Sequence, residues 1–171
     1  MRPSLLAASL VLATVAAGSA FALPPQPGAN PNASAQTGIA QISPAASDAV
    51  QVVNTFMEEL ATGQLEAARQ LMTPNAVVMA NGQVLGTRDG YIDGAAKGDA
   101  TALQGVQREI LRRDADAGPN AGWVVSEKRM RGPGGAQGAP REVVVTETML
   151  LARTTAGWKI THIHWSSRQA G

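Results

Sequence analysis

The order of two hydrophobic patterns along the chain limits its fold more than any other feature. Helical spacing of apolar residues comes first, and three long runs of alternating residues follow at about 106–115, 123–130 and 142–153. A fourth strand-like run, residues 157–168, comes last. Because helices followed by consecutive strands separate into layers, the sequence predicts an α+β fold in which N-terminal helices pack in a curved antiparallel sheet.

Two helices are predicted before the first strand. Apolar residues recur over 50–60 at the spacing of one helix face, with Ser47 placed to cap the start and Gly63 to end the helix. A shorter helix is expected over residues 65–72. The Thr73-Pro74 pair stops it, because a residue before proline is disfavoured in the helical conformation.

A hairpin and a weak helix are predicted next. Residues 76–80 form a strand pattern, Asn81-Gly82 is a strong hairpin turn, and residues 84–86 begin the return strand. Thr87 is placed to cap a third helix. We expect this helix to be short or broken, because three glycines interrupt it: Gly90, Gly94 and Gly98.

The last strand-like run contains both histidines and two of the three tryptophans of the chain. Successive side chains of a strand point to opposite faces. One face therefore carries His162 and His164, and the other carries Ile163 and Trp165. We expect one face to be packed and the other to be available for a cavity.

The turn before this strand decides which residues of the preceding strand lie beside it. A three-residue loop is the favoured connection, with Gly157 in the left-handed conformation. It predicts four cross-strand pairs: Glu147 with Trp165, Met149 with Ile163, Thr148 with His164, and Leu150 with His162. A two-residue loop would exchange these partners and bring Glu147 to the histidine face.

In the favoured register Glu147 is an acid among apolar side chains. Such surroundings raise the pKa of a carboxyl group, which makes Glu147 a candidate general base or acid near neutral pH. The alternative is an ion pair that satisfies the sheet. Its partner would be an arginine of a neighbouring strand: Arg108, Arg112 or Arg129.

His162 and His164 allow a metal-site hypothesis. Two imidazoles on one strand, completed by a carboxylate such as Glu147 or Glu127, would form a three-ligand site. The favoured register turns Glu147 away from the histidines, so we predict no metal site. In the alternative interpretation the histidines form hydrogen bonds to threonines such as Thr146 and help to pack the sheet.

Tyr91 is the single tyrosine of the chain and lies on the uncertain third helix. Its phenol is a candidate donor to a carbonyl ligand in the pocket. Half-buried packing is the alternative.

The chain ends and the composition predict an exported domain. Arg2, an apolar run and Ala20-Phe21-Ala22 are typical of a secretory signal over residues 1–22. Residues 23–45, rich in Pro, Ala, Asn and Gln, predict a disordered tether before one domain over 46–168 and a tail over 169–171. The expected location is the periplasm or the exterior of the cell.

Composition narrows the possible partners. There is no cysteine, which excludes disulfides and thiolate chemistry. Of the 14 Lys and Arg residues, Arg2 lies in the signal, so 13 positive charges balance 13 Asp and Glu residues in the mature chain. Such a balance argues against a nucleic acid or an anionic membrane as the partner. No apolar run comes close to the roughly 20 residues of a membrane span, so we expect no membrane insertion after signal cleavage.

Residues 147–151, the turn, Gly157-Trp158-Lys159-Ile160 and residues 162–168 resemble the closing hairpin of the SnoaL-like branch of the nuclear transport factor 2-like superfamily. This superfamily includes ketosteroid isomerase, scytalone dehydratase and a kinase association domain. The resemblance implies an exported bacterial member with a cone-shaped sheet around a pocket. It implies no single reaction. The tyrosine and aspartate motifs of ketosteroid isomerase have no counterparts that align here.

Together these features predict a protein that binds a small apolar organic molecule without cofactor or metal. The expected pocket is lined by Glu147, Met149, Ile163, Trp165 and Tyr91. The open sheet face would suit a homodimer. A non-catalytic binding role is one hypothesis. The other is a cofactor-independent isomerase, hydro-lyase or cyclase that acts on a lipophilic carbonyl compound with Glu147 as general base.

Overall fold

The computed structural model describes residues 41–132 and 141–170. The predicted signal over 1–22 and most of the predicted tether lie outside these ranges. Residues 41–45 belong to the predicted tether, but they are ordered as strand β1 (Gln41–Ile42) and the start of a 3₁₀ helix (Pro44–Ala46). The prediction was wrong there because backbone pairing of β1 with the sheet edge does not require an apolar sequence.

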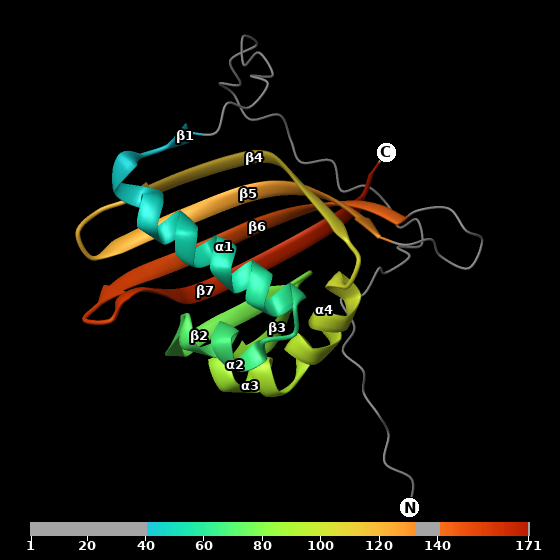
Figure 1. The fold of residues 1–171 in the computed structure, drawn as a ribbon, viewed down its shortest axis with the longest axis horizontal. Coiled ribbons are helices and arrows are strands. Elements are labelled where there is room, and N and C mark those ends of the chain that lie inside the picture. Colours follow the sequence, from blue (N-terminus) through green and yellow to red (C-terminus); the bar gives the residue numbers. More distant parts are fainter. Residues whose placement is uncertain (1–40, 133–140, 171) are drawn as a thin grey trace, which may run out of the picture.

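One seven-stranded sheet forms the body of the molecule, in the order β1-β4-β5-β6-β7-β2-β3. It curves around helix α1 (Ser47–Ala61), which crosses its concave face (Figure 1). The strands after β1 are β2 (Met72–Ala80), β3 (Gln83–Thr87), β4 (Gln107–Ala117), β5 (Ala121–Gly132), β6 (Arg141–Thr154) and β7 (Gly157–Gln169).

The sheet is mixed, whereas the sequence predicted an antiparallel one. The four long strands β4 to β7 do form the predicted antiparallel meander. However, β7 returns beside β2 and runs parallel to it, and β1 is parallel to β4. The order of the strands in the sheet depends on how α1 crosses the sheet. The local hydrophobic pattern of the sequence does not predict that arrangement.

The N-terminal helices differ in detail from the prediction. Ser47 is the first residue of α1 and does not cap it, because the preceding 3₁₀ turn places the buried Ala46 at the cap position. Helix α2 (Leu65–Gln70) ends two residues earlier than predicted. Strand β2 already starts at Met72, where the amide of Ile160 donates to the carbonyl oxygen of Leu71 (2.9 Å). Gly63 ends α1 as predicted, with φ of 75°.

Two local predictions are confirmed. Asn81 and Gly82 form the β2–β3 turn with φ of 47° and 80°, the left-handed geometry of a tight hairpin turn. The third helix is broken at Gly94 into α3 (Arg88–Asp93) and α4 (Ala95–Leu103). Both helices lie with α2 near one edge of the sheet (Figure 1). No helix in the described ranges is long and apolar enough to cross a membrane.

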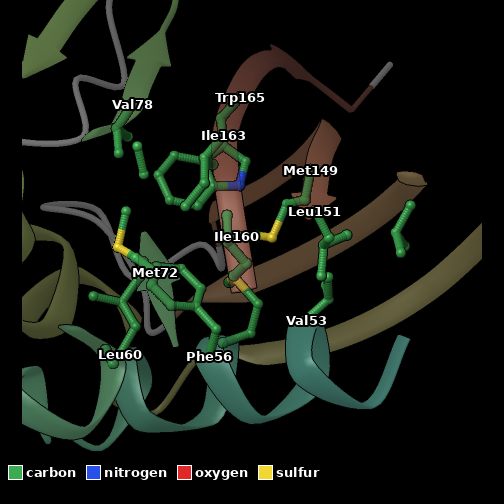
Figure 2. Packing of buried hydrophobic residues seen from close by; sticks show 14 of the residues in the cluster. Val53, Phe56, Leu60, Met72, Val78, Met149, Leu151, Ile160, Ile163 and Trp165 are labelled. Carbon is green, nitrogen blue, oxygen red and sulfur yellow. The ribbon is translucent and has the colours of Figure 1, made fainter. Parts of the chain in front are cut away.

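The core lies between α1 and the concave face of the sheet. Figure 2 shows Val53 of α1 beside Leu151 of β6, while Phe56 and Leu60 lie on the side of Ile160 of β7 and Met72 of β2. Met149, Leu151, Ile160 and Ile163 are at most 2% exposed. The apolar face predicted for α1 is thus confirmed. Its side chains and those of the sheet fill most of the space between the helix and the sheet.

The β6–β7 hairpin has the predicted pairing but a different turn. Thr154 pairs with Gly157, so the loop has two residues and not three. A bulge at Thr161, between the pairs Leu151–Ile160 and Leu150–His162, adds the missing residue. Beyond the bulge the four predicted pairs are present, and Glu147 lies opposite Trp165.

Candidate functional site

Glu147 lies inside the cone, where it is enclosed by its partners. Its side chain is 1% exposed. Oε1 accepts a hydrogen bond from Nζ of Lys128 (2.7 Å), and Oε2 accepts one from Nε1 of Trp165 (2.9 Å). Each carboxylate oxygen therefore has a partner. The indole ring of Trp165 lies between Glu147 and a pocket that Trp165 also lines.

The partner of Glu147 was missed at the sequence level. An ion pair to a neighbouring strand was one of the alternatives, but the arginines named for it lie elsewhere, and Lys128 of β5 is the partner. The signal was present, since Lys128 alternates in step with the buried Val124 and Met130. Burial lowers the pKa of Lys128, and the negative charge of Glu147 opposes that effect.

A second buried polar group joins α1 to the sheet. Nε of Arg113 donates to Oγ of Ser126 (2.9 Å), and its Nη1 donates to Oδ1 of Asn54 (2.6 Å). Burial lowers the pKa of Arg113, and Glu147 opposes this as well. These contacts hold α1 in place over β4 and β5. They therefore help to shape the pocket that α1 borders.

A pocket lies beside this core, between α1, α4 and the ends of β5, β6 and β7. Its unoccupied space is about 540 Å³, part of which is open to solvent. The wall is mostly apolar: Met57, Leu60, Leu103, Met130, Val143, Val145 and Trp165. The polar lining residues are Asn81, Asp99, Ser166 and Ser167. A mostly apolar hollow with a few polar groups is the usual form of a small-molecule site.

Asp99 is the lining residue with an ionisable side chain, and it is 4% exposed. Its Oδ2 accepts a hydrogen bond from the Tyr91 hydroxyl (2.9 Å). Among the described residues Oδ1 has no hydrogen-bond partner, and Asp99 is part of the pocket wall. Burial raises the pKa of Asp99 above its ordinary value of 3.8, and the Tyr91 hydrogen bond partly opposes this.

The break at Gly94 brings Tyr91 and Asp99 together. Eight residues of one continuous helix would separate the two Cα atoms by about 12 Å along its axis. In the structure the chain turns between α3 and α4, and the Tyr91 hydroxyl lies 2.9 Å from Oδ2 of Asp99. Asp99 was not predicted from the sequence, because the glycines indicate a break in the helix but not the direction of the helix that follows. The weak, glycine-rich helix was the available signal.

The predicted lining residues are only partly at the pocket. Trp165 is one of the lining residues. Met149 and Ile163 are fully buried core residues, and Glu147 lies behind Trp165. Tyr91 is also fully buried, with its ring centre 6.1 Å from that of Trp165, and it supports Asp99 from behind. Burial and the nearby Asp99 charge raise the pKa of Tyr91 well above 10.0.

Comparison with known protein families identifies the family of this domain. Residues 49–169 match the family described as the SnoaL-like domain. The chain belongs to the SnoaL-like domain family. The nuclear transport factor 2-like fold predicted from the closing hairpin is therefore confirmed.

Solved structures share the fold of this SnoaL-like domain. A candidate ketosteroid isomerase from Shewanella frigidimarina has 25% identity and a TM-score of 0.64, covering 74% of this chain and all of its own. A candidate dehydratase from Streptomyces avermitilis has 18% identity and a TM-score of 0.60, covering 74% and 98%. An NTF2-like protein with a cystatin-like fold from Novosphingobium aromaticivorans has 13% identity and a TM-score of 0.58, covering 71% and 80%. None of the curated proteins matches the chain.

The histidines of this SnoaL-like domain lie on the opposite face of the sheet from Glu147. His164 is exposed and pairs with Thr148, while His162 is half-buried and pairs with Leu150. The Thr146 hydroxyl is within hydrogen-bond distance of Ser166 (3.1 Å), not of a histidine as the packing hypothesis expected. Within residues 41–132 and 141–170 no three His, Cys, Asp or Glu side chains cluster closely enough to hold a metal ion.

Proposed function

We propose that this SnoaL-like domain binds a small, largely apolar organic molecule in the pocket beside Asp99. The observation that carries the proposal is an apolar hollow whose wall contains one buried carboxyl group, of which one oxygen has no hydrogen-bond partner among the described residues. The apolar wall supplies binding energy through burial of the ligand, and Asp99 sets its orientation.

Glu147 is poorly placed for the general-base role. Its oxygens are held by Lys128 and Trp165, and its side chain is 1% exposed, so a substrate would have to displace packed side chains to reach it. A proton-transfer group needs to lie within hydrogen-bond reach of its substrate. The enzymatic alternative therefore moves to Asp99.

The second candidate function is cofactor-independent isomerisation, dehydration or cyclisation of a lipophilic carbonyl compound, with Asp99 as proton acceptor. It is favoured by the raised pKa of Asp99, which strengthens a carboxylate as a base. The names of the candidate isomerase and dehydratase with the same fold also favour it. Fold similarity alone assigns no reaction, so the test must include turnover.

A thermal-shift screen tests binding. Lipophilic carbonyl compounds, lipophilic amines, and steroid and polyketide fragments are compared on the wild type, on Val143→Trp and on Ile110→Trp. Val143 lines the pocket, whereas Ile110 of β4 is 50% exposed and is not one of the lining residues. A ligand at a hundred times its Kd should stabilise the wild type by about 2.7 kcal/mol. Val143→Trp should abolish the shift and Ile110→Trp should retain it.

Two results separate the outcomes of this screen. If no compound shifts the wild type, or if both tryptophan variants retain the shift, the pocket is not the binding site. For a compound that binds, Asp99→Asn then separates the two functions. Lost turnover with retained binding supports the enzyme, whereas binding without turnover by the wild type supports a binding protein.

We also propose that the protein is exported and forms a homodimer. The signal pattern of residues 1–22 supports export, and cell fractionation tests it. On the sheet face away from α1, the cross-strand neighbours Trp123 and Leu150 are 40% and 43% exposed, which favours a contact with a second copy. Sedimentation of the wild type and of Leu150→Glu tests this. A monomeric wild type would contradict the dimer.

A further inference from the structure

We infer that the ligand of this pocket carries a protonated amine that binds Oδ1 of Asp99. The inference rests on the proposed function, since it concerns the chemistry of the same pocket. It adds a substrate class: lipophilic amines in preference to alcohols, carbonyl compounds and acids of the same shape.

The first argument is the charge around Asp99. The pocket-lining residues on α1, β5 and β6 are apolar, β7 contributes Trp165 and two serines, and the β2–β3 turn contributes Asn81. Helix α3 contributes the Tyr91 hydroxyl. None of these groups is a cation, so the part of the wall formed by described residues contains no positive charge. A buried carboxylate without a counter-ion favours a ligand that brings one.

The second argument is the direction of the hydrogen bonds. Burial raises the pKa of Asp99 and the hydrogen bond from Tyr91 partly opposes this, so the group is ionised above its raised pKa, and an ionised carboxylate only accepts. A ligand group that meets Oδ1 of the ionised form must therefore donate. An ammonium donates and carries the complementary charge, a hydroxyl donates without it, and a carbonyl or carboxylate oxygen does neither.

The third argument is internal to the molecule. The other carboxylate of the cone interior, Glu147, has an ammonium 2.7 Å from one of its oxygens. Nε1 of Trp165 donates to Glu147, so the pocket meets carbon atoms of the indole and not its N–H. An alkyl or aryl amine would reproduce at Asp99 the pairing that Lys128 provides at Glu147. Its apolar body would contact Trp165 and the leucine and methionine side chains beside it.

Three molecules of matched shape test the inference: 4-phenylbutylamine, 4-phenyl-1-butanol and 4-phenylbutanoate. Their Kd values for the purified protein are measured by calorimetry from pH 5 to pH 8. We expect the amine to bind at least about tenfold more tightly than the alcohol, and the carboxylate to bind most weakly. Amine affinity should rise with pH as Asp99 loses its proton and then become constant.

Two variants identify the group responsible. Asp99→Asn keeps an acceptor for the Tyr91 hydroxyl but removes the charge, so amine affinity should fall to that of the alcohol while alcohol affinity is retained. Tyr91→Phe removes the donor to Oδ2, which raises the pKa of Asp99 and should move the rise in amine affinity to higher pH. A purely structural role of Tyr91 would instead weaken all three ligands equally.

The outcomes separate this inference from the proposed function. If the alcohol binds as tightly as the amine, or if affinity falls as pH rises, the amine inference is overturned and the pocket remains a binding site. If Asp99→Asn leaves the preference for the amine intact, Asp99 is not the group responsible and the inference is again overturned. If none of the three molecules binds, the proposed function fails and the inference fails with it.

Discussion

Nζ of Lys128 lies 2.7 Å from Oε1 of Glu147, and the two side chains are only 5% and 1% exposed. Removing one member of such a pair leaves the other charge buried without a partner, at a typical cost of about 3–5 kcal/mol. Glu147→Gln keeps an acceptor for the Trp165 N–H but removes the negative charge. We expect it to lower the free energy of unfolding by about that amount at pH 7, measured by urea denaturation.

The double variant Lys128→Met/Glu147→Gln is the control for this pair. It removes both charges and should recover most of the lost stability. The pKa of Lys128 is already lowered by burial, so the native state loses this proton before the unfolded state does. The stability of Glu147→Gln should therefore rise as pH increases toward 10.5, the ordinary pKa of lysine. Equal loss in the single and double variants would contradict the coupling.

Asp99→Asn should stabilise the protein at neutral pH. Because burial raises the pKa of Asp99, its stabilising contribution is present below the ordinary value of 3.8 and is lost as pH rises through the higher folded-state pKa. Asparagine has no such pH dependence and can still accept the Tyr91 hydrogen bond. Unfolding free energies of the two proteins, measured from pH 7 to pH 4, should differ most at pH 7 and converge toward pH 4.

Asp48→Asn serves as the control for that comparison. It removes the same formal charge from a side chain that is 79% exposed in the first turn of α1. A gain in stability in both variants would indicate a general charge effect and not the burial of Asp99. A lower stability of Asp99→Asn at pH 7 would mean that the carboxylate has a partner that stabilises it.

The sequence predicted the strands better than it predicted the site. Apolar and polar residues alternate along a strand wherever the strand lies in the sheet. The long strands and the inward direction of Glu147 could therefore be predicted. The pocket could not, because its wall combines residues far apart in the chain, such as Met57 of α1 and Val143 of β6. Their proximity depends on how α1 crosses the sheet.

Asp99 and Lys128 illustrate two further limits. Lys128 was predictable from alternation, but a lysine in step with buried residues is usually taken for a surface group, because lysine is rarely buried. Asp99 depends on the angle between α3 and α4, and that angle is set by the unusual backbone at Gly94, with φ of −113° and ψ of −101°. The glycine indicated a break, but not its direction.

Gly94→Ala should destabilise the turn that brings Tyr91 to Asp99. An added Cβ would lie 2.8 Å from the carbonyl oxygen of Gly90, a backbone atom that cannot move without shifting α3. We expect a loss of about 1–3 kcal/mol in unfolding free energy. Gly90→Ala is the matched control, since its Cβ would meet nothing closer than 3.9 Å and alanine favours a helix. A cost for Gly90→Ala equal to that for Gly94→Ala would contradict this account.

The bulge at Thr161 makes a prediction about two single-residue deletions of equal length. In β7, Ile160 is buried before the bulge, and Ile163 and Trp165 are buried after it. Deleting Thr161 removes the extra residue and leaves every buried side chain facing the core. Deleting Lys159 can also remove the bulge, but the alternation of side chains then turns Ile160 outward and Thr161 inward.

We therefore expect the Lys159 deletion to be less stable than the Thr161 deletion by about 2 kcal/mol or more, the cost of losing a buried isoleucine. Urea denaturation of both proteins measures the difference, and near-ultraviolet circular dichroism of the tryptophans shows whether each keeps a packed core. Equal stability of the two deletions would mean that the bulge does not determine which side chains of β7 point to the core.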